Sequence, residues 1–369
     1  MAPAPRFALG HAAGSDGAAA AIAALRGSPT APPSANLGFV YTSQEAAGEL
    51  PNILKILKRE SGIKDWVGAA GIGLCATGTE YFRRPAVATL IGAFADDTFR
   101  VVDSDKQKTW KKLHPGPADE PAFGIVHGDP SGSDILQLVP TFAEATNSFL
   151  VGGLTSPEVG HGQVAGGVTS GGLSGVLFAS SVAVATGLSQ GCSPIGPIRR
   201  VTEAHRNVAI KIDGKPAYDV FLEDIGPELA ANLRRAAGRI FVAFPVRGSD
   251  RNDYVVRNIV GIDPERKLVG IGDLLEDGQP VMFCRRDVET ARTDLRRMLG
   301  DLRKRTKKEA KGAIYCSCVA RGPHLFDEQE EMAMIAEELG EVPLVGFYGS
   351  GEISHNRLYT QTGVLSLFL

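Results

Sequence analysis

The stretch Ala-Ile-Tyr-Cys-Ser-Cys-Val-Ala-Arg-Gly at residues 313–322 begins the part of the chain that decides the fold. An acidic segment with helical periodicity follows it. Two further apolar runs come next, Val-Pro-Leu-Val-Gly-Phe-Tyr-Gly-Ser-Gly-Glu-Ile at 342–353 and Thr-Gly-Val-Leu-Ser-Leu-Phe-Leu at 362–369. The runs are rich in β-prone residues and the connections are rich in glycine. The pattern predicts a strand, a loop, a helix, a second strand, a glycine-rich loop and a third strand.

The same order of elements occurs twice earlier, beginning at residues 37 and 122. Because strand–helix–strand connections favour parallel pairing with a right-handed crossover, we expect an α/β (α+β) protein whose mixed sheets are built from these repeated units. We expect Pro140 to kink or stop the second helix. Each predicted helix has apolar residues at i, i+3, i+4 and i+7: Leu50, Ile53, Leu54 and Leu57; Ile135, Leu138, Val139 and Phe142; Met332, Ile335, Ala336 and Leu339.

A chain of 369 residues is long enough for two domains. We place an N-terminal helix and linker at 1–36, a first domain at 37–237 and a second at 238–369, with Gly238 as the seam. The polar, proline-containing residues 95–121 are expected to be an insertion or linker. The β-prone residues 218–222 are expected to pair with 208–212 as a hairpin.

The charge balance gives no reason to expect a nucleic-acid partner, since 39 Lys and Arg oppose 42 Asp and Glu. No run approaches the roughly 18 apolar residues of a membrane helix, so no membrane partner is expected. Five scattered cysteines argue against a disulfide framework. A reducing, cytoplasmic location follows as an expectation.

Several motifs in order resemble the FIST family, over roughly residues 37–368. The segments 318–322 and 342–353 are similar to the FIST C-terminal domain. The segments 191–197, 201–204 and 213–217 are similar to the closing part of the FIST N-terminal domain, and the loop 151–153 resembles another part of the same domain. One departure is that this chain has Gln190-Gly191-Cys192 where the family often has a His-Gly pair.

The resemblance implies a sensory, signal-transduction protein that binds a small ligand, possibly an amino acid. One similar subfamily senses nitric oxide through bound haem, so haem is a possible cofactor, although none is predicted here. A separate signalling protein is the expected partner.

Charged residues beside apolar strands are the best candidates for ligand contacts. Arg321 could clamp a carboxylate and Glu352 could receive an ammonium group, and the alternative is that they form a salt bridge with each other. Glu80 follows the first glycine loop much as Glu352 follows the third. Thr155 and Arg199 complete the expected contacts.

Glycine-rich turns after strands let a ligand approach the backbone, or they only permit tight packing. The candidates are Gly152, Gly153, Gly349 and Gly351, in loops that are expected to line one cleft.

A different reading is an enzyme that uses Cys192 or His127. Arg199 and Arg200 near Cys192 could lower its thiol pKa, and His127 ends a strand. A single histidine would also suffice as a haem ligand. No nucleophile elbow or paired carboxylates are present, so we expect a protein that is not an enzyme. Cys316 and Cys318 lie on one face of a strand and are expected to be buried thiols.

Overall fold

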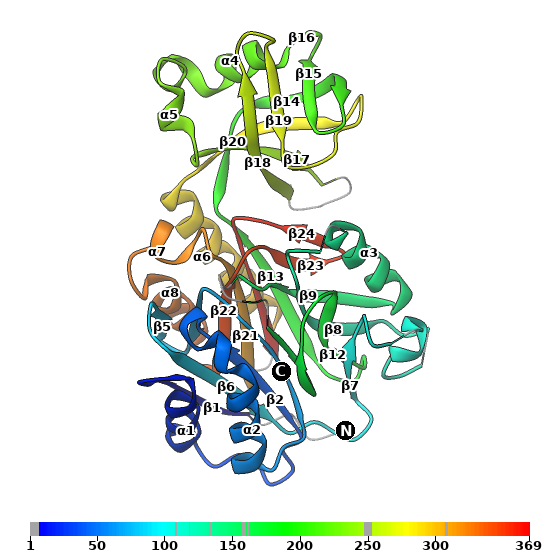
Figure 1. The fold of residues 1–369 in the computed structure, drawn as a ribbon, viewed down its shortest axis with the longest axis vertical. Helices are drawn as coiled ribbons and strands as arrows, with labels where there is room; N and C mark the ends of the chain where they lie inside the picture. Colours follow the sequence, from blue (N-terminus) through cyan, green and yellow to red (C-terminus); the bar gives the residue numbers. More distant parts are fainter. Residues whose placement is uncertain are drawn as a thin grey trace. The chain divides into compact units, whose positions relative to one another are not determined.

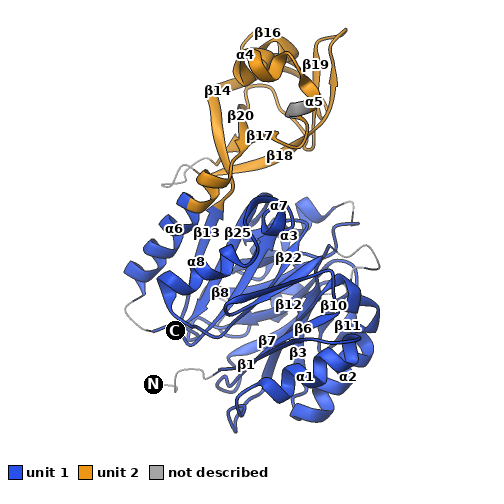
Figure 2. Cartoon of the chain, turned by 90° about the vertical axis from the view of Figure 1, so that its left-hand side faces the viewer, with its two compact units in different colours: residues 1–189, 293–369 blue, residues 190–292 orange. Residues whose placement is uncertain are grey.

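The computed structural model describes residues 7–107, 109–117, 119–132, 134–156, 160, 162–246, 253–306 and 309–369. The chain divides into two compact units (Figure 2). Unit 1 comprises residues 1–189 and 293–369, and unit 2 comprises residues 190–292. The predicted seam at Gly238 falls inside unit 2, so the compact units and the predicted sequence domains are different divisions of the chain.

Three six-stranded sheets form unit 1 (Figure 1). In each sheet a central strand pairs in parallel with the strand after the helix and antiparallel with a returning strand. The predicted parallel pairing is therefore confirmed three times, and the fold is α+β with mixed sheets. In the order central strand, helix, parallel strand and returning strand, the first repeat consists of β2 (Leu37–Thr42), α2 (Leu50–Ser61), β3 (Asp65–Ala70) and β6 (Ala86–Gly92). The second consists of β8 (Ala122–Gly128), α3 (Ile135–Ala145), β9 (Ser148–Leu154) and β12 (Leu173–Phe178). The third consists of β21 (Gly312–Cys318), α8 (Glu330–Leu339), β22 (Leu344–Gly349) and β25 (Thr362–Phe368).

A two-stranded hairpin follows each parallel strand and joins the sheet of a different repeat. The three exchanges form a closed cycle that links all three sheets. The hairpins are β4 (Gly73–Ala76) and β5 (Thr79–Phe82), which extend β22; β10 (Gln163–Ala165) and β11 (Gly167–Thr169), which extend β3; and β23 (Glu352–His355) and β24 (Arg357–Tyr359), which extend β9.

Three edge strands and several short elements complete unit 1. One edge strand lies within residues 1–36, which were predicted as a helix and linker and of which 1–6 lie outside the described residues, and another lies within the predicted insertion or linker at 95–121. These elements are β1 (Phe7–Ala13), β7 (Phe99–Asp103), β13 (Val184–Gln190), α1 (Gly17–Gly27), α7 (Gly322–Leu325), and the 3₁₀ helices η1 (Gln44–Glu49) and η2 (Trp110–Leu113). Helix α6 (Val288–Arg305) leads from unit 2 back into unit 1.

Helix α3 runs through Pro140 to Ala145, so of the two expected effects of this proline, a kink or a stop, the stop is wrong. Full burial of Val139 and Phe142 stabilises the helix on both sides of the proline. The carbonyl freed by proline is that of Leu136, which is 38% exposed, so water can satisfy it.

The inner faces of the three sheets share one apolar core, which includes Phe39, Ile125, Phe347 and Phe368. Helices α2 and α3 cover outer faces and bury further clusters beneath them. The parallel strands β3, β9 and β22 therefore border one common core, and a site can form where their ends approach one another.

Unit 2 is a small antiparallel barrel. Its strands run in the order β14-β20-β17-β18-β19-β15-β16, and a pairing of β14 with β15 closes the ring. Residues 218–222, predicted as a strand, belong to helix α4, which buries Val220 and Phe221 in the barrel core. The elements are β14 (Cys192–His205), β15 (Val208–Ile212), β16 (Lys215–Pro216), α4 (Ala217–Ala230), α5 (Leu233–Ala236), β17 (Ile240–Pro245), β18 (Tyr254–Asp263), β19 (Leu268–Ile271) and β20 (Pro280–Arg286).

Candidate functional site

Close backbone packing identifies equivalent positions in the three sheets of unit 1. A Cβ atom at Gly68, Gly152 or Gly346 would lie 1.7–1.8 Å from a carbonyl oxygen of the neighbouring central strand. Real Cβ atoms do not approach a carbonyl this closely, so only glycine fits at these positions. In the next position along the central strands, the three sheets carry Tyr41, His127 and Cys316.

Two of these three side chains are hydrogen-bonded to each other in the interior. The Tyr41 hydroxyl lies 3.0 Å from His127 Nε2, and Phe347 stacks on the Tyr41 ring at 5.1 Å between centroids. Burial lowers the pKa of His127 to about 3 and raises the pKa of Tyr41 and of the Cys316 thiol. His127 is therefore neutral, and its Nδ1 has no hydrogen-bond partner among the described residues.

The hairpin strands also have an equivalent position, occupied by Leu74, Gln163 and Glu352. Leu74 packs in the core. The Gln163 amide is satisfied: its Oε1 accepts from Ser174 Oγ at 2.5 Å and its Nε2 donates to the carbonyl of Gly171 at 3.1 Å. Both polar atoms of the Gln163 amide are therefore hydrogen-bonded within the protein itself.

Glu352 is fully buried and is only half satisfied. Its Oε2 accepts from the amide and the hydroxyl of Thr362, at 3.2 and 2.7 Å. No N–H or O–H donor of the described residues reaches Oε1. Burial raises the pKa of Glu352 to about 8, against the lowering effect of Thr362 and, less strongly, of Arg321 and Cys318. Gly153 separates Glu352 from His127 across the sheet and leaves the position between them without a side chain.

Arg321 lies three residues beyond the end of β21, directly before α7, and is also fully buried. It pairs with Glu331 of α8, through Nε at 2.8 Å and Nη2 at 2.7 Å, and not with Glu352 as the alternative interpretation held. Tyr315 and Ser317 donate to the same carboxylate at 2.6 and 3.1 Å. The guanidinium lies over the Phe326 ring at 5.1 Å, and its Nη1 has no hydrogen-bond partner among the described residues. A buried donor and a buried acceptor that are both unpaired call for a ligand, a water or an ion.

Glu331 was not singled out in the sequence, because its charge places it on a solvated helix face by default. Glu80, which was compared with Glu352, is not its equivalent: Glu80 pairs with Cys75 in the hairpin, and Leu74 takes the equivalent place. Burial and the nearby Glu331 raise the pKa of Glu80 to about 7.

The glycine-rich loops after β9 and β22 are hydrogen-bonded to each other through their backbones. Leu154 donates to the Gly351 carbonyl at 2.8 Å, and Ser350 donates to the Leu154 carbonyl at 3.0 Å. A Cβ at Gly349 would lie 2.4 Å from the same Leu154 carbonyl. Thr155 is buried, and its amide donates to Gly128 at 2.9 Å. These contacts account for Gly349 and Gly351 without a ligand, and the close strand approach accounts for Gly152.

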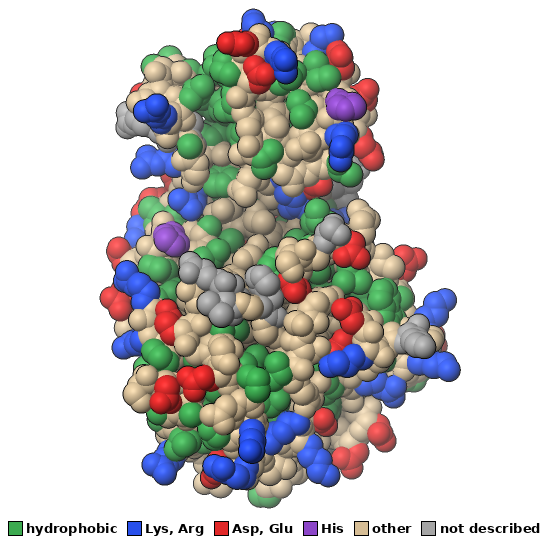
Figure 3. Space-filling view, in the orientation of Figure 1, with side chains coloured by type: hydrophobic (Ala, Val, Ile, Leu, Met, Phe, Trp, Pro, Cys, Tyr) green, Lys and Arg blue, Asp and Glu red, His purple; other side chains and the backbone are tan. Residues whose placement is uncertain are grey.

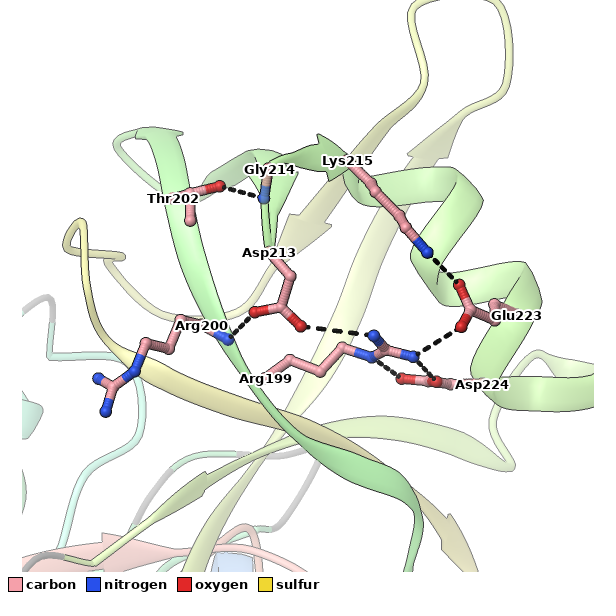
Figure 4. A network of polar contacts seen from close by, with 8 residues as sticks. All are labelled: Arg199, Arg200, Thr202, Asp213, Gly214, Lys215, Glu223 and Asp224. Atoms are coloured by element: carbon pink, nitrogen blue, oxygen red, sulfur yellow. Dashed lines mark hydrogen bonds and ion pairs between the residues drawn. The ribbon is translucent and has the colours of Figure 1, made fainter.

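Arg199 and Cys192 belong to unit 2, whereas the other predicted site residues belong to unit 1. The Arg199 guanidinium binds Asp224 through Nε and Nη2, and reaches Asp213 and Glu223 at 3.4 and 3.3 Å (Figure 4). It thereby fastens α4 to the strand β14. With these carboxylates in place, its donors are already engaged.

The cysteines are buried, as predicted for Cys316 and Cys318. Burial raises the pKa of both thiols, and a contact with Cys192 raises that of Cys284. In the described part of the chain, no group of three or more His, Cys, Asp or Glu side chains could hold a metal ion.

Haem, which the resemblance raised, does not fit His127. Its Nε2 already faces Tyr41, and its ring packs 5.7 Å from Phe347 between centroids, with no exposed surface. His355 is exposed and stacks on Phe149 at 5.1 Å between ring centroids. His161 lies outside the described residues.

Acidic and basic side chains are interspersed on the face of the molecule seen in Figure 3. No helix of the described ranges has the length and apolar character needed to cross a membrane.

Comparison with protein families and with known proteins gives matches over most of the chain. The family model described as the FIST N domain matches residues 36–215, and the FIST C domain model matches residues 217–355. An uncharacterized protein of Mycobacterium tuberculosis, MT0656, is 31% identical over 212 residues, which is 55% of each chain. An uncharacterized protein of Mycobacterium bovis, Mb0898c, is 30% identical over 191 residues, 49% of this chain and 50% of the relative. The chain thus aligns with about half the length of these relatives.

Proposed function

Because the chain belongs to the FIST family, whose domains are linked to signal-transduction sensing, we propose that it is a sensory protein that binds a small amino acid in unit 1. The ligand-binding residues are Glu352 and Arg321, with His127 close by across Gly153.

One observation carries the proposal. Of the three equivalent hairpin positions, Leu74 is apolar, Gln163 is satisfied, and only Glu352 keeps a buried oxygen without an N–H or O–H donor, with the weakly donating Cys318 thiol beside the carboxyl group. Arg321, close enough to Glu352 to lower its pKa, keeps an unpaired Nη1. An unpaired buried polar group costs about 1–3 kcal/mol, so two such groups at one end of β21 favour a ligand that satisfies both.

An amino acid matches these two atoms in chemistry. Its ammonium group would donate to Glu352 Oε1, and its carboxylate would accept from Arg321 Nη1. Both atoms are fully buried, so the ligand enters only through a local opening, and slow association is expected. A small side chain suits the enclosed position better than a large one.

The proposal is tested by thermal shift and calorimetry with glycine and L-alanine, against acetate and methylamine, which each lack one of the two charged groups. The amino acids should raise the Tm, and the half-ligands should not. Glu352→Gln should abolish the shift. Gln163→Leu, at the equivalent but satisfied position, should retain it. A wild-type protein that no amino acid stabilises would overturn the proposal.

The enzyme reading has less support. Burial raises the thiol pKa of Cys316 and Cys318, which opposes thiolate chemistry, and Cys192 is itself buried. We therefore propose a binding protein that signals to a separate partner protein. Selective alkylation of Cys192 by iodoacetamide at neutral pH would favour the enzyme instead.

A further inference from the structure

Two segments of unit 1 connect it to unit 2, and they are bonded to each other. Strand β13 runs through Ser189, the last residue of unit 1 before the chain enters unit 2, to Gln190, and α6 carries the chain back. Arg305 Nη2 of α6 donates to the carbonyl of Thr186 at 2.7 Å, and Arg297 Nη2 donates to that of Leu188 at 3.4 Å.

The absence of a side chain at Gly187 lets α6 lie directly on β13. A Cβ there would lie 2.5 Å from Met298 Sδ. Strand β13 and helix α6 therefore pack as one pair, so that a displacement of the end of β13 would also displace α6, the second connection to unit 2.

The proposed ligand site reaches this pair through one side chain. Arg321 Nη2 donates to Ser189 Oγ at 3.5 Å, and both residues are fully buried. The other interaction of Nη2 is with Glu331, at 2.7 Å. Ser189 Oγ thus accepts the second Nη2 hydrogen, next to Nη1, which has no hydrogen-bond partner among the described residues.

We propose that Arg321 couples ligand binding in unit 1 to unit 2 by exchanging Ser189 for the carboxylate of the ligand. This inference rests on the proposed function. Carboxylates bind guanidinium groups bidentately, and here the second hydrogen is the one that Ser189 holds. Binding therefore releases the end of β13, and the two states differ in a named contact, as a ligand-driven shift requires.

The competition predicts two effects of opposite kind for Ser189→Ala. Glycine binds a few-fold more tightly, since no hydroxyl competes for Nη2. At the same time, the response of unit 2 to glycine is lost. A variant that merely destabilised the fold would weaken both the affinity for glycine and the response of unit 2. Ser366→Ala, which removes another buried serine of the same sheet, serves as the matched control.

Hydrogen–deuterium exchange of the full chain, read by mass spectrometry, tests the coupling. In wild-type protein and Ser366→Ala, saturating glycine should change exchange in peptides of residues 190–246 and 253–292, and in Ser189→Ala it should not. Without any ligand, Arg321→Lys and Ser189→Ala should each alter exchange in those same peptides, because both remove the contact.

The outcomes separate the two proposals. If glycine binds and Ser189→Ala responds like wild type, the coupling is refuted and the ligand site stands. If no amino acid binds, the ligand proposal fails and the exchange with an amino acid fails with it, and the ligand-free comparison decides only whether the Arg321–Ser189 contact influences unit 2. Unchanged exchange in unit 2 for both ligand-free variants would overturn the coupling.

Discussion

The junctions at Gln163 and Glu352 have equivalent strand pairing, but they differ in whether their buried polar atoms are hydrogen-bonded. Each residue begins a hairpin that is paired with a parallel strand of another repeat, opposite Ala69 or Gly153. Gln163 makes its hydrogen bonds to Ser174 and Gly171 and leaves nothing open. The Glu352 carboxyl group is equally buried, and one of its oxygens, Oε1, has no N–H or O–H donor among the described residues. The difference is what singles out the Glu352 junction, of the three equivalent ones, for the proposed ligand.

The ion pair beside Glu352 should give the largest effect. Glu331→Ala leaves the fully buried Arg321 without its counter-charge, and losing one partner of a buried pair costs about 3–5 kcal/mol. Urea denaturation measures the free energy of unfolding. Glu337→Ala on the same helix, which lacks this role, is the control. A loss below about 1 kcal/mol would mean that water reaches Arg321 readily.

Equivalence of the three sheets can be broken at their close-packed glycines. Gly152→Ala places a Cβ 1.8 Å from the Val126 carbonyl, and overpacking of this kind costs about 1–3 kcal/mol or more. Gly68→Ala and Gly346→Ala should lose similar amounts. Gly167→Ala, where no atom lies within 4 Å of the added Cβ, should be tolerated. A tolerated Gly152→Ala would contradict the register on which the comparison depends.

Removal of the side-chain amide sharpens the contrast between the two junctions. Gln163→Leu should cost about 1–2 kcal/mol, because it leaves the Ser174 hydroxyl without its partner. Glu352→Gln should cost less than this near pH 8, because it removes a carboxyl that burial makes costly to ionise. Equal losses in chemical denaturation would indicate that Glu352 is as well satisfied as Gln163.

The pH dependence of stability follows from the pKa of Glu352, raised to about 8. The folded state holds this proton more tightly than the unfolded state, so its contribution is complete below about pH 4 and is lost as the pH rises toward 8. Glu80, with a pKa of about 7, acts in the same direction. His127 acts oppositely, since its pKa is lowered to about 3, and it destabilises the fold as the pH falls below about 6.5.

Denaturation midpoints between pH 4.5 and 8.5 measure this slope. The stability of Glu352→Gln relative to wild type should increase with pH over this range. A difference that is independent of pH would place the proton elsewhere.

Local patterns predicted much of this fold. The three helices and their parallel strands follow from apolar periodicity and short connections, and burial bears out residues such as Leu57 and Ile335. The exchange of hairpins was not predictable, because it pairs segments hundreds of residues apart, such as β4 with β22. Residues 218–222 were misassigned because their β-prone side chains pack into the barrel as a helix.

The candidate site was predicted in part. Arg321 and Glu352 stood out as charges beside apolar strands, but their partners Glu331 and Thr362 are set by tertiary packing. Arg199 looked similar in sequence, and only the structure shows that three carboxylates surround it. Whether a charge is paired is a property of the fold, and no local pattern reports it.

Native mass spectrometry of the full chain with a mixture of amino acids tests the central claim most directly. The account predicts one bound amino-acid mass on wild-type protein and on Gln163→Leu, and none on Glu352→Gln. Binding that survives Glu352→Gln, or that is lost equally in Gln163→Leu, would contradict the assignment of the ligand site to the Glu352 junction.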